Sequence, residues 1–219
     1  MSDIFERTDI YIESLDSGNT QFLDELERRA IEGDVPIIRK SMQRFIKLML
    51  KMNRPKDILE VGTAIGFSSI LMAQYSDAHI TTIEKYEPRF ALAEKNFLDS
   101  GFSDRITFLK GDATDILKEM AAKLGDNDGK YDFIFMDAAK GQYINFLPDV
   151  LALLKKGGVL ITDNVLQDNT VIQSKYTVVR RDRTIHKRMR EYLYTLMNMD
   201  GLTTDILQIG DGISVSVKN

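Results

Sequence analysis

Acidic and amide side chains follow two apolar runs of this chain, and their types suit a divalent cation. Asp137 comes directly after the run 131–136, and Asp163 and Asn164 come directly after the run 158–162. If the two runs are neighbouring parallel strands, all three side chains meet at one edge of a sheet. Two carboxylates and an amide oxygen can bind Mg²⁺, Mn²⁺ or Ca²⁺, with water or substrate completing the coordination. The alternative is that the aspartates cap helices and that Asn164 is a turn residue.

A glycine turn upstream has the features of a nucleoside-binding loop. Gly62 and Gly66 follow the run 57–61 and allow a tight turn that a ligand can approach closely. Their G-x-x-x-G spacing lacks the dinucleotide fingerprint. Glu84 ends the next strand, where a carboxylate can accept hydrogen bonds from a ribose, and Asp112 follows the third strand near the expected adenine. The pattern favours a mononucleoside cofactor such as S-adenosylmethionine over a purely structural turn.

Alternating strands and helices must position these residues. Two helices are predicted first, over 20–33 and from Pro36 to about Met52. Further helices are predicted at 67–75, 87–98, 114–124, 142–154 and about 183–199, with strands at 57–61, 78–83, 105–109, 131–136, 159–162, 202–208 and 213–218, and a loop at 125–129. This alternation predicts an α/β fold, in which a sheet of about seven strands is mostly parallel, ends in an antiparallel strand and carries helices on both faces.

The length and composition of the chain narrow its class. At 219 residues it is long enough for one well-buried α/β domain and short for two. No apolar run approaches a membrane span and the N-terminus lacks a signal-peptide pattern, so we expect a cytoplasmic protein with no membrane partner. The absence of cysteine excludes disulfides and a Cys nucleophile. The chain has only two histidines, His79 and His186, which argues against a zinc site built from histidine.

A basic segment interrupts an otherwise acidic chain. The net charge is −4, yet residues 174–190 contain one acid, Asp182, and seven bases. These bases are Lys175, Arg180, Arg181, Arg183, Lys187, Arg188 and Arg190. Such a patch indicates a phosphate-bearing partner, either RNA or a CoA thioester, and a solvated helix face is the alternative.

Four strings together resemble the metal-dependent class I O-methyltransferases of the catechol and caffeoyl-CoA type. They are ILEVGTAIGFS at 58–68, MDAAK followed by GQY at 136–143, TDN at 162–164 and GDGI at 210–213. The resemblance covers roughly residues 32–217, and it is greatest to the bacterial branch that methylates 5-hydroxyuridine in tRNA. The chain departs from the catechol enzymes inside the glycine turn, where Ala64 and Ile65 replace an aromatic residue.

The resemblance implies a role for each motif. It implies a single Rossmann-like methyltransferase domain over 1–219, in which 1–55 form a helical lid or dimer segment and 56–219 the catalytic core of a homodimer. Lys140 matches the proposed general base, while Tyr143 and Phe146 are either core residues or a stacking platform. S-adenosylmethionine would lie against Ile38, Glu60, Gly62, Ser68, Glu84, Asp112, Ala113 and Asp137, and the metal would bind Asp137, Asp163 and Asn164.

Two acceptors are compatible with this resemblance, and both carry adjacent oxygens that a cation could chelate. The leading hypothesis is methylation of wobble 5-hydroxyuridine in tRNA to 5-methoxyuridine. The anticodon loop would then contact Lys175, Arg180, Arg181, Arg183, Lys187 and Arg188. The alternative is a small catechol or a caffeoyl-CoA-like phenol. Two alternatives belong to other classes, an NAD-dependent dehydrogenase, which needs the missing fingerprint glycines, and a non-catalytic RNA-binding module.

Overall fold

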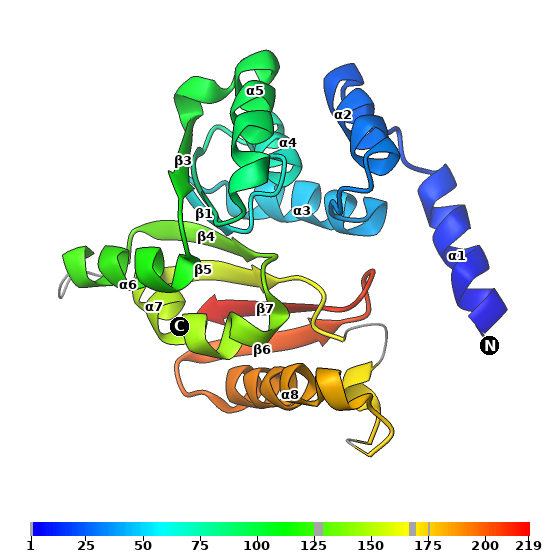
Figure 1. Ribbon diagram of the computed structural model, residues 1–219, viewed down its shortest axis with the longest axis vertical. Coiled ribbons are helices and arrows are strands. Elements are labelled where there is room, and N and C mark those ends of the chain that lie inside the picture. Colours follow the sequence, from blue (N-terminus) through cyan, green and yellow to red (C-terminus); the bar gives the residue numbers. More distant parts are fainter. Residues whose placement is uncertain (1, 125–128, 167–169, 175) are drawn as a thin grey trace.

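The computed structural model describes residues 2–124, 129–166, 170–174 and 176–219, so most of the loop expected at 125–129 lies outside it. Within these ranges a twisted sheet is flanked by helices on both faces (Figure 1). Its strands are β1 (Asp57–Val61), β2 (His79–Glu84), β3 (Ile106–Lys110), β4 (Tyr131–Met136), β5 (Leu154–Thr162), β6 (Leu202–Leu207) and β7 (Ile213–Lys218). The α-helices are α1 (Ser2–Ser14), α2 (Gln21–Glu32), α3 (Lys40–Asn53), α4 (Phe67–Tyr75), α5 (Phe90–Ser100), α6 (Ala113–Leu124), α7 (Tyr143–Leu153) and α8 (Arg183–Asn198).

The sheet has the strand order β3-β2-β1-β4-β5-β7-β6. Strands β1 to β5 pair in parallel, and β7 is antiparallel to both of its neighbours. The predicted sheet of about seven mostly parallel strands with an antiparallel last strand is therefore confirmed. The chain moves outward in opposite directions from β1 and β4, which makes their carboxyl ends the switch point where open α/β sheets bind ligands.

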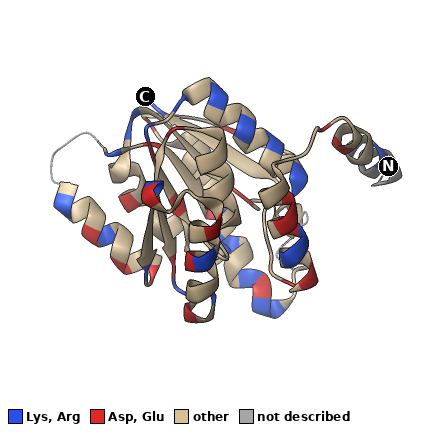
Figure 2. Ribbon diagram, turned by 90° about the horizontal axis from the view of Figure 1, so that it is seen from above, with Lys and Arg blue, Asp and Glu red and all other residues tan. Residues whose placement is uncertain are grey.

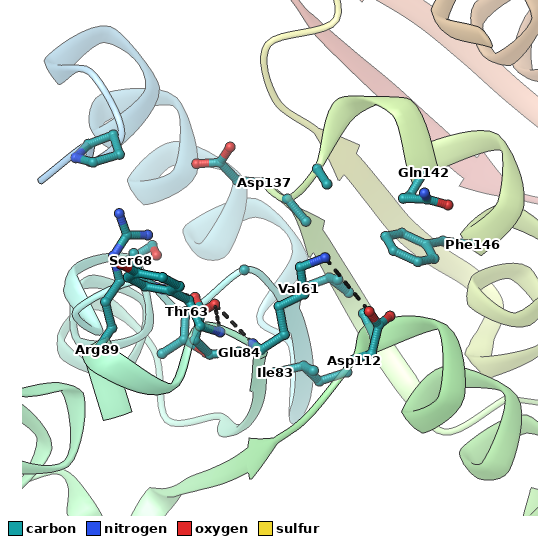
Figure 3. A pocket seen from close by; sticks show the side chains of 18 of the residues that line it. Val61, Thr63, Ser68, Ile83, Glu84, Arg89, Asp112, Asp137, Gln142 and Phe146 are labelled. Atoms are coloured by element: carbon teal, nitrogen blue, oxygen red, sulfur yellow. Dashed lines mark hydrogen bonds and ion pairs between the residues drawn. The ribbon is translucent and has the colours of Figure 1, made fainter. Parts of the chain in front are cut away.

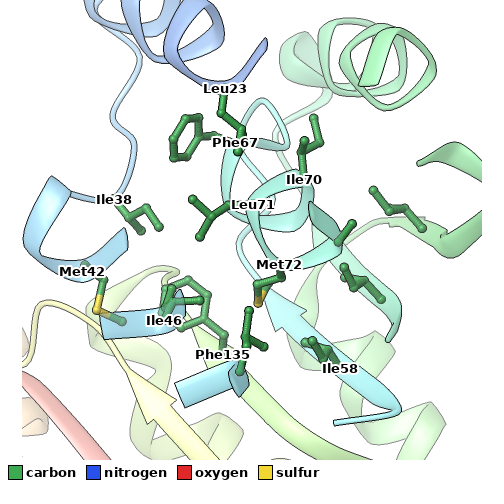
Figure 4. Close-up of a cluster of buried hydrophobic side chains, with 14 of the residues drawn as sticks. Leu23, Ile38, Met42, Ile46, Ile58, Phe67, Ile70, Leu71, Met72 and Phe135 are labelled. Carbon is green, nitrogen blue, oxygen red and sulfur yellow. The ribbon is translucent and has the colours of Figure 1, made fainter. Parts of the chain in front are cut away.

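The central strands are buried on both faces, which explains their continuous apolar runs. Along β4, Phe133 and Phe135 face one hydrophobic cluster, and Ile134 and Met136 face the other. The first cluster also contains side chains from helices α2 to α5 (Figure 4). The second lies beneath α6, α7 and α8. Both clusters hold the sheet rigid behind its carboxyl edge.

The segment before α3 differs from the prediction of a helix beginning at Pro36. Helix α2 ends at Glu32, one residue before the predicted end at Gly33, which is its C-cap, but α3 begins only at Lys40. Tertiary contacts keep the chain between them out of a helix, because the buried side chain of Ile38 packs in the first cluster. The carbonyl of Ile38 also accepts a hydrogen bond from the Gln43 side chain at 3.0 Å.

The junction between α7 and β5 also differs from the prediction. The sequence predicted a helix to Leu154 and a strand from Val159, whereas the helix ends at Leu153 and the strand begins at Leu154. Leu154 already pairs with Tyr131 of β4, and the register shifts before Phe133. Cross-strand pairing therefore overrides the local glycines of this stretch. The end of β5, which positions the acidic residues, is as predicted at Thr162.

Candidate active site

Strand register brings the three expected cation ligands together. The parallel strands β4 and β5 pair Met136 with Thr162 at their carboxyl ends, so the next residues are neighbours. The backbone N–H of Asp163 donates to the carbonyl of Met136 at 2.9 Å. Asn164 follows with a φ of 59°, and its Nδ2 donates to Oδ1 of Asp137 at 3.2 Å. All three ligand side chains line one cavity.

The positive charge beside the two carboxyl groups of this cluster does not offset the effect of their burial. Burial raises the pKa of Asp163 to about 7, and the nearby Asp137 adds to the shift. Burial also raises the pKa of Asp137, although Lys140 and the Asn164 hydrogen bond oppose it. A bound divalent ion would offset both carboxylate charges, so the electrostatics of the cluster fit a cation.

The donor types also fit a hard divalent cation. Carboxylate and amide oxygens are the ligands that Mg²⁺ and Ca²⁺ prefer. Asn164 now turns its amide nitrogen toward Asp137, and a half-turn of the amide would present the oxygen instead. Among the described residues, no three His, Cys, Asp or Glu side chains gather into a metal site. A cation would therefore rest on Asp137, Asp163 and Asn164, completed by water or substrate.

Lys140 lies beside this cluster. It begins the short 3-10 helix η3 (Lys140–Gln142), and it lines the same cavity as the acids. Its positive charge lowers the pKa of both Asp137 and Asp163. The structure thus brings Lys140 to the cluster, and its role as a general base stays a prediction.

A larger cavity of about 400 Å³ opens at the carboxyl ends of β1, β2 and β4. Its size suits a nucleoside ligand. In Figure 3, Ser68, Glu84, Asp112 and Asp137 reach it from different elements. Seven of the residues expected to hold the cofactor line this cavity, namely Ile38, Gly62, Ser68, Glu84, Asp112, Ala113 and Asp137.

The turn requires glycine at two positions, because other atoms of the chain approach its backbone closely. Gly62 has a φ of 109°, and a Cβ atom there would lie 1.9 Å from the carbonyl oxygen of Asp137. Gly66 has a φ of 87°, and its Cβ would lie 2.4 Å from the ring of Phe97. Only glycine avoids both the strain and the clash. The turn therefore packs β1 directly against the residue that joins the two cavities.

Glu84 and Asp112 present oriented carboxylates to the larger cavity. Glu84 accepts backbone hydrogen bonds from Ala64 and Tyr86, each at 2.8 Å, and from Lys85 at 2.9 Å. These bonds fix its side chain and leave acceptor capacity for ribose hydroxyls. Asp112 accepts a hydrogen bond from the Thr114 backbone at 2.9 Å, which lowers its pKa. Its ionised form can accept a hydrogen bond from an adenine amine.

Glu60 lies differently from the expectation that it contacts the cofactor. It is fully buried and is absent from the residues that line the cavity. Its Oε2 accepts hydrogen bonds from the hydroxyl of Ser69 and, at 2.6 Å, from that of Thr82. Strand alternation explains this position, because Glu60 shares a face of β1 with Ile58 and points into the helical layer. Glu60 therefore supports the glycine turn from below.

A second cavity of about 350 Å³ holds the acidic cluster and Lys140. Asp137 lines both cavities, and so do Pro36, Ile37 and Ile38 of the segment before α3. Arg39 also lines this cavity, and its guanidinium contacts the Asp211 carboxylate at 2.9 Å. The two cavities therefore adjoin at Asp137.

Sequence reasoning missed several residues of both cavities. Arg39 had no motif, and Asp211 belonged to the recognised GDGI string without an assigned role. Phe146, for which the sequence leaves a core role and a stacking role open, is both buried and part of the larger cavity. Tyr143 is fully buried and lines neither cavity, so the stacking interpretation is wrong for it.

The basic segment lies beside the second cavity. Helix α8 contacts η3, and Arg188 donates to the carbonyl of Gly141 at 3.0 Å. Arg180, Arg181, Arg183 and Lys187 are exposed, whereas Lys175 lies outside the described residues. Elsewhere basic and acidic residues are interspersed over the ribbon (Figure 2). In the described part of the chain, no helix combines the length and apolar character needed to cross a bilayer.

Comparisons with known proteins agree with the family expected from the motifs. A family model described as O-methyltransferase matches residues 13–219. A catechol O-methyltransferase from Niastella koreensis is 31% identical over 179 residues, which cover 80% of this chain and 79% of the relative. A caffeoyl-CoA O-methyltransferase from Populus kitakamiensis is 30% identical over 176 residues, which cover 78% of this chain and 74% of that protein.

Solved structures share the fold. A Staphylococcus aureus protein, provisionally named a caffeoyl-CoA O-methyltransferase, is 33% identical with a TM-score of 0.83, and the alignment covers 100% of both chains. An O-methyltransferase from Bacillus cereus, solved in complex with SAH, has a TM-score of 0.83 at 23% identity and covers 97% of both chains. The second likeness supports the fold alone. The matches favour methyl transfer over the dehydrogenase alternative.

Proposed function

The chain belongs to the O-methyltransferase family, and we propose from this premise that it methylates a hydroxyl group lying beside a second oxygen atom. S-adenosylmethionine would occupy the larger cavity, and the acceptor would occupy the second. The observation that carries the proposal is the position of Asp137, which lines both cavities. A methyl donor and an acceptor in these cavities would meet at this residue.

The reaction is an in-line displacement. The acceptor oxygen attacks the methyl carbon, the carbon–sulfur bond breaks, and the sulfur keeps the electron pair as S-adenosylhomocysteine is formed. The protein gains rate chiefly by holding oxygen, carbon and sulfur in line. A divalent cation held by Asp137, Asp163 and Asn164 would lower the pKa of the acceptor hydroxyl and fix its orientation.

Lys140 is the group in the second cavity that we propose accepts the hydroxyl proton. It lines this cavity with the acids and lies one short turn from Asp137. Its neutral amine would take the proton as the oxygen attacks, and the ammonium so formed would release it to water. We assign Asp137 and Asp163 to the cation and not to proton transfer, because their carboxylates would compensate its charge.

For the acceptor we propose a small catechol-like phenol or a phenolic CoA ester. The relatives named for catechol and caffeoyl-CoA support this class. The test is methyl transfer from labelled S-adenosylmethionine to a panel of catechols, caffeoyl-CoA and matched phenols with a single hydroxyl. Transfer to vicinal but not to single hydroxyls is expected. Equal transfer to both would contradict chelation of two adjacent oxygens.

A second candidate acceptor is wobble 5-hydroxyuridine in tRNA. It is supported by the basic helix α8, which contacts η3 beside Lys140 and exposes Arg181, Arg183 and Lys187. Cations there could bind anticodon phosphates, and such binding weakens steeply with salt. Mass spectrometry of tRNA nucleosides from a deletion strain tests this candidate. Loss of 5-methoxyuridine supports it, and an unchanged amount excludes it.

We also propose that two copies of the chain associate. Helix α1 lies at the outside of the helical layer (Figure 1), where its Ile10 and Tyr11 are 60% and 64% exposed and Leu15, which follows the helix, is 66% exposed. Apolar side chains gathered on one surface helix favour burial against a partner. Light scattering after size exclusion should give twice the chain mass of 25.0 kDa, and a single-chain mass would refute the proposal.

A further inference from the structure

Tyr143 is a buried tyrosine directly beneath the acidic cluster. It begins α7, and its side chain has no exposed surface. Its ring packs against that of Tyr192, with centroids 5.6 Å apart. A phenylalanine would fill the same space, so ring packing alone does not account for the hydroxyl. A buried hydroxyl costs free energy unless it is hydrogen-bonded, and its partners therefore indicate its purpose.

The Tyr143 hydroxyl bonds to backbone beside each of the expected cation ligands. It accepts the N–H of Ala138 at 3.2 Å and lies 3.2 Å from the Ala138 carbonyl. It also lies 3.3 Å from the carbonyl of Asp163. The hydroxyl has one proton, so it can accept from Ala138 and donate to the Asp163 carbonyl at the same time. One hydroxyl therefore joins the turn after β4 to the end of β5.

These two backbone segments set the directions of the ligand side chains. The first follows Asp137 immediately. The second is the peptide between Asp163 and Asn164, where the chain enters the left-handed conformation at Asn164. Asparagine tolerates this conformation, but it needs fixed neighbours to hold it. A hydrogen bond to the Asp163 carbonyl fixes that peptide plane, and with it the starting direction of the Asn164 side chain.

We infer that Tyr143 is a positioning residue whose hydroxyl sets the geometry of the cation site formed by Asp137, Asp163 and Asn164. The inference rests on the proposed function, because that function supplies the cation. Tyr143 touches neither cavity, so it acts only through the backbone. Hydrogen-bonding groups behind metal ligands typically change metal affinity by about 10- to 100-fold when removed.

The test is Tyr143→Phe in the full-length chain, which keeps the ring and removes the hydroxyl. Mn²⁺ binding is followed by electron paramagnetic resonance, and S-adenosylhomocysteine binding by calorimetry. We expect Mn²⁺ affinity to fall about 10-fold, with S-adenosylhomocysteine affinity unchanged. With an accepted substrate, excess Mn²⁺ should restore most of kcat, because the ligands themselves remain.

Tyr131→Phe is the matched control. Tyr131 is also buried, and within the described part of the chain its hydroxyl has no hydrogen-bond partner. Removing that hydroxyl should leave Mn²⁺ affinity unchanged. Hydrogen exchange without metal gives a second readout, since the Ala138 N–H should lose protection in Tyr143→Phe and keep it in Tyr131→Phe.

The possible outcomes separate this inference from the proposed function. If the parent protein binds no Mn²⁺ in the site, the cation role fails and the inference falls with it. If the parent binds Mn²⁺ and Tyr143→Phe binds it equally well, the inference alone is refuted. An equal loss of Mn²⁺ and S-adenosylhomocysteine affinity in Tyr143→Phe, or a large fall in Tm, would show general loosening and would also refute it.

Discussion

The buried carboxyl group of Glu60 should make stability depend on pH, and Glu60→Gln tests this. Glu60 has no exposed surface, and burial raises its pKa from 4.5 to about 7. Between these two pH values the unfolded chain loses the proton while the folded chain keeps it. Stability is therefore unaffected below about pH 4.5, falls as the pH rises, and reaches its full loss above about pH 7.

The size of the effect follows from the pKa shift. One pKa unit corresponds to about 1.4 kcal/mol, so the shift from 4.5 to about 7 costs the folded state about 3 kcal/mol above pH 7. Glutamine carries no charge and avoids this cost. It accepts less well from the hydroxyls of Ser69 and Thr82, which costs about 1 kcal/mol. We expect Glu60→Gln to be slightly less stable than the parent at pH 5 and about 2 kcal/mol more stable at pH 8.

Urea unfolding followed by circular dichroism at pH 5 and pH 8 measures this difference. EDTA is present throughout, so that no cation at the neighbouring acids contributes. Glu191→Gln on the outer face of α8 is the control, because Glu191 is exposed and its replacement should change stability equally at both pH values. If the stability difference between Glu60→Gln and the parent is the same at pH 5 and pH 8, the argument from burial is refuted.

Three further predictions concern the ligands and the reaction. EDTA should abolish turnover while S-adenosylhomocysteine still binds by calorimetry, and full turnover in EDTA would refute the cation role. Lys140→Met should lower kcat about 10²-fold or more at unchanged S-adenosylhomocysteine affinity, and an unchanged kcat would exclude it as the base. Gly62→Ala should abolish S-adenosylhomocysteine binding, because its Cβ would lie 1.9 Å from the Asp137 carbonyl. Gly101→Ala, with nothing within 4 Å, should bind normally.

Local patterns predicted the sheet and its acidic edge because both follow from one-dimensional rules. Apolar runs of strand length alternate with helical segments, and the carboxyl ends of parallel strands share an edge. The same rules do not predict contacts between side chains that are far apart in the sequence. Arg39 and Asp211 are 172 residues apart, and no periodicity relates them. Glu60 shows a different limit, because alternation along β1 sets its face although its motif suggested a ligand contact.

The segment 36–39, which is not helical, has a consequence for how the two ligands bind. A helix advances only about 1.5 Å per residue, against about 3.3 Å for a fully extended chain, so a helix from Pro36 would shorten the segment. Pro36, Ile37 and Ile38 could not then line both cavities, as they do. The segment is held open at its end by Gln43, bonded to Ile38, and by Arg39, bonded to Asp211. One wall thus serves both ligands.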